Sequence, residues 1–141
     1  MLIAESDYRG WDAVEMARLV RERQVTAADL AETALARIKE LGALNAVADL
    51  AGLADGTQAG PAGEGALAGV PFAVKELLAW PGLPWTMGSR LMGSNPAPGL
   101  SPYAARIRDC GLNVICSATS SEFGLLGSTE SALRGPTLNP W

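Results

Sequence analysis

The 141-residue chain contains no histidine. This absence excludes Ser-His-Asp and Cys-His catalysis, zinc sites of the HExxH type and proton shuttling through imidazole, if this chain alone must supply the residues. A general base on this chain is therefore a lysine, an aspartate, a glutamate or a tyrosine.

Cysteine is nearly absent as well. Cys110 and Cys116 are the only two, and they are six positions apart, at the end of an expected helix and in the strand after it. A disulfide across so short a span would be strained. We expect both thiols to be reduced and buried.

The chain also has little positive charge and no long apolar run. It carries 11 basic and 15 acidic residues, a net charge of -4, and no Lys/Arg cluster interleaved with aromatic residues. Direct nucleic-acid binding is therefore not expected. No apolar run approaches the roughly 20 residues of a membrane-spanning helix, and the N-terminus lacks the layout of a signal peptide. We expect a cytoplasmic protein without a membrane partner, and the sequence predicts no metal site and no cofactor.

What is present fits a folded domain. Apolar residues make up 48% of the chain and charged residues 18%, while 16 glycines and 9 prolines predict many loops. The length permits one compact unit with its own core.

The N-terminal region predicts two helices. Residues 11–24 place apolar side chains at helical spacing, with charged side chains on the opposite face. In the segment TAADLAETALARIKELG, Thr26 is suited to cap the helix N-terminus, Asp29 stands three residues on, and Gly42 is suited to a left-handed closing position. The two helices together predict a helical hairpin.

The centre of the chain predicts a strand, a helix and a second strand. The stretch GVPFAVKELL at 69–78 is an apolar strand that ends in a charge. The segment SPYAARIRDCG predicts a helix with Ser101 as N-cap, Pro102 at its first position and Gly111 as its stop. The strand LNVIC follows at 112–116. This order indicates a βαβ unit with a parallel pair, and hence an α/β fold.

The other segments are less regular. Leu44–Leu50 is either a short strand or the start of a helix, and residues 51–65 are a surface loop or a linker. Residues 81–99 form a long loop that is rich in Gly and Pro yet carries apolar side chains, which is typical of a functional loop. The tail predicts a short helical piece at 121–126 and an extended ending.

Lys75 is the candidate base, because it stands at the end of the apolar strand. Two interpretations remain open from position alone. The side chain can extend to water with its stem packed, which is the usual arrangement for a strand-end lysine. Alternatively it lies in a dry pocket, where desolvation lets a neutral amine accept a proton. The adjacent Glu76 should point to the opposite face, because side chains alternate along a strand.

Five segments together resemble the amidase signature hydrolases. They are GVPFAVKELL, MGSRLM, SPYAARIRDCGLNVI, SSEFG and GPTLNPW, and they occur in the order and at the spacing of that family. The resemblance covers roughly residues 10–141 and is strongest from Gly69 onward.

The resemblance implies a fold and a mechanism. The fold would be the N-terminal part of an α/β/α sandwich with a mixed sheet, in which residues 1–43 form the helical hairpin and residues 44–141 begin the core. The mechanism would be a Ser-cis-Ser-Lys triad that hydrolyses a small carboxamide through an acyl-enzyme. Lys75 matches the family's ultimate base, and Gly124, Leu125 and Leu126 match a segment that approaches the substrate channel.

The chain departs from the family pattern in two places. ICSATS at 115–120 stands where many members have an LGKTN-like turn, so contacts of that turn's lysine are missing. The family's GGSSGGS segment follows the NPW motif within about ten residues, whereas the sequence ends at Trp141. We therefore expect both catalytic serines outside this sequence, and an inactive fragment if the chain is alone. The serines Ser117, Ser120, Ser121 and Ser128 are expected to make loop and capping hydrogen bonds.

Three functions follow as hypotheses. The first is an amide hydrolase completed by the missing C-terminal portion. The second is the glutamine-hydrolysing subunit of a tRNA-dependent amidotransferase, because the family includes such subunits. The third is a noncatalytic piece that docks through exposed strand edges, onto the missing portion or onto a homo-oligomer partner.

Overall fold

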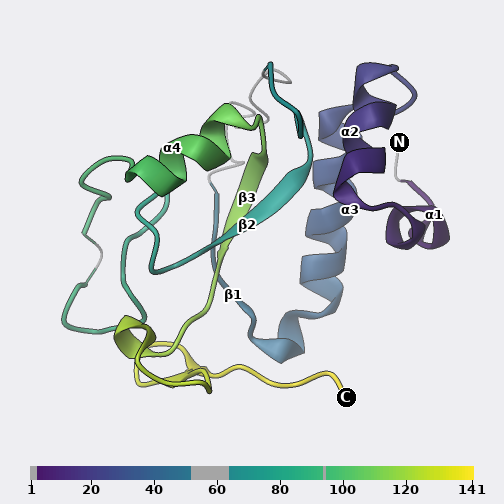
Figure 1. Cartoon of the computed structure of the whole chain (residues 1–141). Coiled ribbons are helices and arrows are strands. Elements are labelled where there is room, and N and C mark those ends of the chain that lie inside the picture. Colours follow the sequence, from purple (N-terminus) through teal and green to yellow (C-terminus); the bar gives the residue numbers. More distant parts are fainter. Residues whose placement is uncertain (1–2, 52–63, 94) are drawn as a thin grey trace.

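The computed structural model describes residues 3–51, 64–93 and 95–141. Figure 1 shows helices at the N-terminal end, a small sheet in the middle and a helix on its far side. In chain order the elements are α1 (Glu5–Gly10), α2 (Ala13–Arg21), α3 (Ala27–Glu40), η1 (Gly42–Leu44), β1 (Val47–Leu50), β2 (Pro71–Lys75), α4 (Pro102–Asp109), β3 (Asn113–Ala118), η3 (Glu122–Gly124), β4 (Glu130–Ser131) and β5 (Gly135–Pro136).

The first predicted helix is present as α2, but it is shorter than expected. The Asp12 carboxylate caps it by accepting a hydrogen bond from the Glu15 amide at 2.8 Å. The helix ends before Arg23, which adopts a left-handed conformation with φ of 58°. The short helix α1 was not predicted, because six residues are too few to leave a clear periodic pattern.

The capping of α3 was predicted correctly at its start and wrongly at its end. Thr26 and Asp29 form a reciprocal capping box, with both backbone-to-side-chain distances 3.0 Å. At the other end the chain continues into η1, and the left-handed residue is Asn45, not Gly42. The Asn45 side-chain amide donates to the carbonyl oxygens of Arg134 and Pro136, at 2.8 and 2.9 Å. These tertiary bonds hold Asn45 in a conformation that asparagine tolerates.

The sheet has the strand order β1-β3-β2 and is mixed. Strand β2 runs parallel to β3, as the βαβ pattern predicts, and Lys75 lies opposite Ala118. Strand β1 runs antiparallel to β3, which decides the open alternative for Leu44–Leu50 in favour of a strand. Helix α4 connects the parallel pair, with Ser101 as its N-cap, Pro102 in its first turn and Gly111 at φ of 78° behind it.

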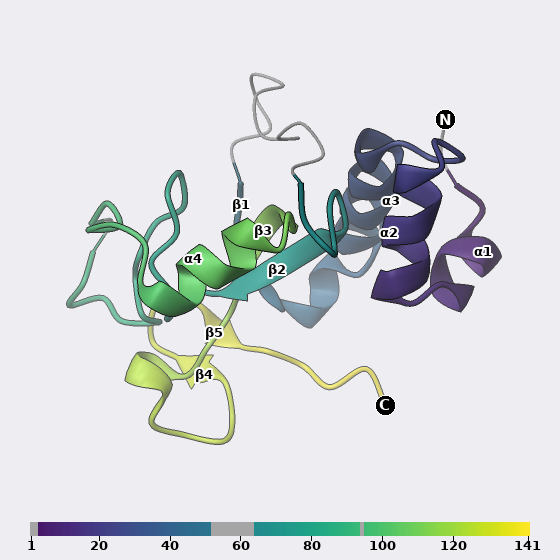
Figure 2. The same cartoon turned by 45° about the horizontal axis from the view of Figure 1, so that its top comes forward.

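Helices cover both faces of the sheet. Figures 1 and 2 show α4 on one side of β2 and β3, and α3 on the other side with α2 and α1 beyond it. On the α4 side, Ile107 packs with Val74 and Val114. On the α3 side, Ala31 and Ala34 pack with Ile115 and Cys116. The α/β/α layering implied by the resemblance is therefore confirmed for this part of the fold.

The C-terminal region matches its prediction only in part. The short helical piece is present as η3, within the predicted range 121–126. The ending is not merely extended, because β4 and β5 pair as a small antiparallel hairpin. Two-residue strands are too short to show alternation in the sequence. Of the expected loop or linker at 51–65, residues 52–63 lie outside the described residues.

The two cysteines are both free, as expected, but only one is buried. Cys116 lies in β3 with 1% of its surface exposed, and burial raises the pKa of its thiol. Cys110 is exposed, so its predicted burial is wrong. It caps the C-terminal end of α4, where the chain turns at the molecular surface. Among the described residues, the helices are too short or too polar to cross a bilayer.

Candidate functional site

Lys75 is the last residue of β2, at the edge where the parallel strands β2 and β3 both end. In open α/β sheets, ligands bind at the carboxyl ends of the strands, so this is the edge where a site is expected. The Lys75 side chain is exposed, whereas the neighbouring Val74 is 1% exposed. The described residues therefore do not form the dry pocket that we considered for Lys75. Alternation turns Val74 and Glu76 inward and leaves the Lys75 side chain exposed at the end of the strand.

Glu76 lies on the opposite face from Lys75, as predicted, and only 1% of its surface is exposed. Its carboxylate accepts hydrogen bonds from the Ser120 amide at 2.8 Å and from the Thr86 hydroxyl at 2.6 Å. The Ser120 hydroxyl and the Arg134 Nε also donate to it, each at 3.3 Å. A buried carboxylate thus joins the end of β2 to three other segments. In the sequence, charge at the end of an apolar run marks both Lys75 and Glu76, but we assigned a role only to Lys75.

Arg134 is the positive partner of this buried carboxylate. It precedes β5, and 19% of its side chain is exposed. Its guanidinium also donates to the Ala48 carbonyl oxygen at 3.0 Å and pairs with the Asp49 carboxylate, both in β1. The network therefore connects the small C-terminal hairpin with the ends of β1 and β2. Sequence analysis did not identify Arg134, because its partners are far away along the chain.

The predicted substrate segment lies next to the chain that follows Lys75. A Cβ placed on Gly124 would lie 2.7 Å from Cδ1 of Leu77, so the Leu77 side chain packs directly on the Gly124 backbone. Leu125 and Leu126 are 80% and 70% exposed. The Ser121 hydroxyl fixes the turn by donating to the Leu126 carbonyl oxygen at 3.0 Å and accepting from the Leu126 amide at 3.2 Å. The segment is thus ordered, apolar and open to a ligand or another chain.

Ser120 and Ser121 make the expected hydrogen bonds in the turn after β3, whereas Ser117 lies within β3 and not in a loop. Ser117, Ser120 and Ser121 are buried, and Ser128 is exposed. The Ser117 hydroxyl donates to the Asp49 carbonyl oxygen at 3.5 Å. Within the part of the chain that the structure describes, no hydrogen bond joins any of these hydroxyls to Lys75.

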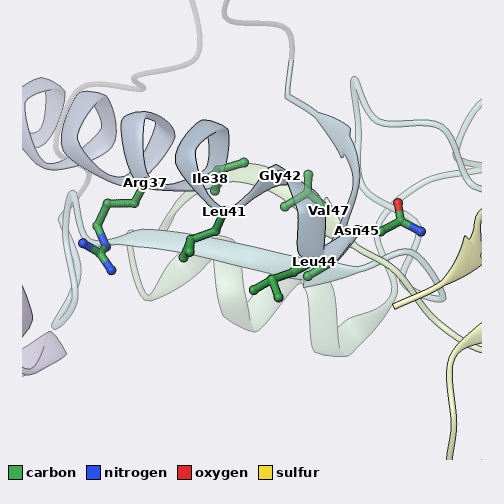
Figure 3. Close-up of a pocket in the computed structure, with 8 residues that line it drawn as sticks. Arg37, Ile38, Leu41, Gly42, Leu44, Asn45 and Val47 are labelled. Atoms are coloured by element: carbon green, nitrogen blue, oxygen red, sulfur yellow. The ribbon is translucent and has the colours of Figure 1, made fainter. Parts of the chain in front are cut away.

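Two hollows in the surface are relevant to binding. One, of about 370 Å³, is formed in part by the segment that follows Lys75 in the chain, and is lined by Leu77, Leu78, Ala79, Trp85, Pro98, Gly99, Leu100 and Ser101. The other, of about 270 Å³, lies between the end of α3 and the start of β1. Figure 3 shows Leu41 and Leu44 at this second pocket and Asn45 turned away from them. Among the described residues that line this pocket, Arg37 is the one that carries a charge, so they offer no acid-base pair. The described residues contain no group of three or more His, Cys, Asp or Glu side chains that could hold a metal.

Comparison with known proteins gives consistent matches. The family model described as "Amidase" matches residues 28–141. A glutamyl-tRNA(Gln) amidotransferase subunit from Deinococcus radiodurans is 36% identical over 135 residues, which are 92% of this chain and 28% of that protein. The solved structure of 6-aminohexanoate cyclic dimer hydrolase superimposes with a TM-score of 0.83 at 26% identity, and covers 93% of this chain and 28% of that one. A bacterial aryl acylamidase of the amidase signature family gives a TM-score of 0.81 at 27% identity, over 92% of this chain and 29% of that one. The chain therefore spans less than a third of the length of these proteins.

Proposed function

Because this chain belongs to the amidase family, we propose that it is the lysine-bearing part of an amide hydrolase. The observation that carries the proposal is the position of Lys75. It stands within the matched range 28–141, at the carboxyl edge of the parallel strands. The complete hydrolase would consist of this chain and a serine-bearing segment, either joined to it or supplied as a second polypeptide. Its substrate would be a small carboxamide.

In the proposed reaction, the neutral amine of Lys75 accepts a proton from a relay serine, which in turn takes the proton of the nucleophilic serine. The nucleophilic oxygen forms a bond to the carboxamide carbon, and the amine leaves with a proton returned through the same relay. Water then hydrolyses the acyl-enzyme and regenerates the serine. The exposure of Lys75 is compatible with this role, because the uncovered side chain is accessible to a segment that would enclose it.

The test is the substitution Lys75→Ala in the complete hydrolase. We expect kcat to fall by about 10²- to 10⁴-fold, the range of a lost general base. Lys39→Ala is the matched control, because Lys39 is the only other lysine and is exposed on α3. Turnover of the folded Lys75→Ala protein close to that of the control would remove Lys75 from the mechanism.

Glutamine hydrolysis for an amidotransferase is the second candidate. It is favoured by the names of the relatives, since the glutamyl-tRNA(Gln) amidotransferase subunits from Deinococcus radiodurans and Corynebacterium diphtheriae are 36% and 29% identical to this chain. A parallel screen of glutamine, aryl amides and short aliphatic amides separates the candidates. Ammonia release from glutamine that rises when partner subunits are added would support the second candidate. Rapid cleavage of aryl or aliphatic amides without partners would support the first.

A noncatalytic docking role is the third candidate. Strand β2 is at the edge of the described sheet, since the order is β1-β3-β2. An unpaired edge can add a strand from another chain. Sedimentation of the 141-residue chain tests this role, which predicts self-association or binding of the serine-bearing segment. A monomer that binds neither would contradict it.

A further inference from the structure

We infer that Glu76 is a positioning residue of the proposed hydrolase, whose buried carboxylate clamps the end of β2 and thereby fixes where Lys75 is presented. The inference rests on the proposed function, because it assigns a task relative to Lys75. It adds a residue that does not itself reach the substrate, since Glu76 is 1% exposed on the face opposite Lys75.

The first support is that the carboxylate reaches three separate segments. One oxygen accepts from the amide and the hydroxyl of Ser120, in the turn after β3. The other accepts from the Thr86 hydroxyl in the long apolar loop and from Arg134 before β5. The long loop, the β3 turn and the C-terminal hairpin therefore meet at one side chain.

The second support is that the backbone of Glu76 is also held. Its amide donates to the Ala118 carbonyl oxygen at 2.9 Å, and its own carbonyl oxygen accepts from the Met87 amide at 3.3 Å. Every polar atom of Glu76 is thus hydrogen-bonded. Lys75 is joined to this fixed residue by a peptide bond, so the clamp restricts the direction of the lysine side chain.

The third support is backbone strain around the clamp. Met87 and Phe123 have φ of 51° and 52°, and the Phe123 amide donates to the Met87 carbonyl oxygen at 2.8 Å. Positive φ is unfavourable for such large residues and persists only where the surroundings enforce it. Gly88 packs so closely on the β3 turn that an added Cβ would lie 3.0 Å from the Ser120 carbonyl oxygen. The turns that contact Glu76 are therefore held in one arrangement, as a site that positions a catalytic group requires.

The variant Glu76→Gln tests the clamp with little change in shape. An amide can still accept from Ser120, but its NH₂ group cannot accept from Arg134. Arg134 keeps its hydrogen bonds to Ala48 and Asp49, so we expect the variant to remain folded. Thr86→Val is a second variant that keeps the carboxylate, because it removes one hydrogen bond to Glu76, together with the longer bond from the Gly88 amide, at nearly constant volume. Glu40→Gln, at an exposed position at the end of α3, is the matched control.

The first measurement is amide hydrogen exchange of the 141-residue chain. We expect Glu76→Gln to speed exchange at least about tenfold at the amides of Glu76, Met87 and Ser120, because local opening becomes easier. Exchange in α2 and α3 should stay within about twofold of the control. Unchanged exchange at the three amides would overturn the clamp, whatever the enzyme does.

The second measurement is kinetics of the complete hydrolase, with the same variants. We expect Glu76→Gln to lower kcat at least about tenfold and Thr86→Val to lower it less, with KM within about twofold, because misplacing a catalytic group acts on the chemical step. A purely structural role would lower the folded fraction and leave kcat per folded molecule unchanged.

The two proposals fail in distinguishable ways. If Lys75→Ala leaves turnover intact, the proposed role of Lys75 as base is wrong and the positioning role of Glu76 falls with it. If Lys75→Ala abolishes turnover while folded Glu76→Gln turns over normally, the proposed function stands and only the positioning role of Glu76 is wrong.

Discussion

At the scale of single residues, Gly111 and Gly42 both follow a helix but contribute differently to the backbone. Gly111 ends α4 with φ of 78°, a conformation available to glycine at little cost. Gly42 was expected to play the same part for α3, but the left-handed residue there is Asn45. The two helical patterns look alike in the sequence. The difference arises from Asn45, which is anchored to Arg134 and Pro136 in the distant hairpin.

These two glycines make a matched pair for stability. A Cβ on Gly111 would lie 2.9 Å from the backbone Cα of Ala68 and would also face the cost of positive φ. We expect Gly111→Ala to lower the free energy of unfolding by at least about 1 kcal/mol. Gly42→Ala should change it by less than about 0.5 kcal/mol, since nothing lies within 4 Å of the added Cβ. Urea unfolding of both variants checks this, and equal destabilisation would contradict the assigned backbone role of Gly111.

At the scale of elements, helices and strands were predicted correctly where they were long enough to show a periodic pattern. Helix α3 has 14 residues and a capping box, and it was found with its N-terminus correct. Helix α1 was not predicted, and it is attached to α3 partly by an ion pair. Its Glu5 carboxylate pairs with Arg37 of α3 and, at 3.6 Å, with Arg9. No pattern in the sequence of α1 indicates that Glu5 pairs with Arg37, which is 32 positions away.

The attachment of α1 should therefore depend on pH. The hydrogen bond from Arg37, followed by its charge, lowers the pKa of Glu5 below its ordinary value of 4.5. A lowered pKa means that the pairing stabilises the docked helix above pH 4.5 and that this stabilisation is lost as pH falls through the pKa of the folded state. NMR shifts of the α1 amides should report undocking in that acidic window. Glu5→Gln should remove the pH dependence, and α1 shifts that titrate unchanged in this variant would contradict the assignment.

At the scale of the whole molecule, helices and sheet share buried residues. Leu30 of α3 is 0% exposed and packs with Met16 and Ala17 of α2 and with Val70 before β2. The helical hairpin and the sheet region are thus in contact through α3, while the predicted boundary between residues 43 and 44 stays a prediction.

Removing the side chain at this junction should weaken the whole fold. We expect Leu30→Ala to cost about 2 to 5 kcal/mol, the usual range for emptying a buried leucine site. Glu32→Ala, at an exposed position two residues further along α3, should cost less than about 0.5 kcal/mol. Urea unfolding followed by far-UV circular dichroism measures both. A loss confined to the helices, with the sheet unfolding at its original midpoint, would contradict a shared core.

The sequence by itself determined the βαβ unit, the caps at Thr26 and Ser101 and the place of Lys75 at a strand end. These features depend on side-chain periodicity and on hydrogen bonds within a few residues, so a local pattern is enough to specify them. Only the tertiary structure decided that Lys75 is exposed and that Glu76 is buried against Arg134, 58 positions later. Burial and charge pairing depend on which distant segments the fold brings together, and one sequence does not encode that in any local pattern.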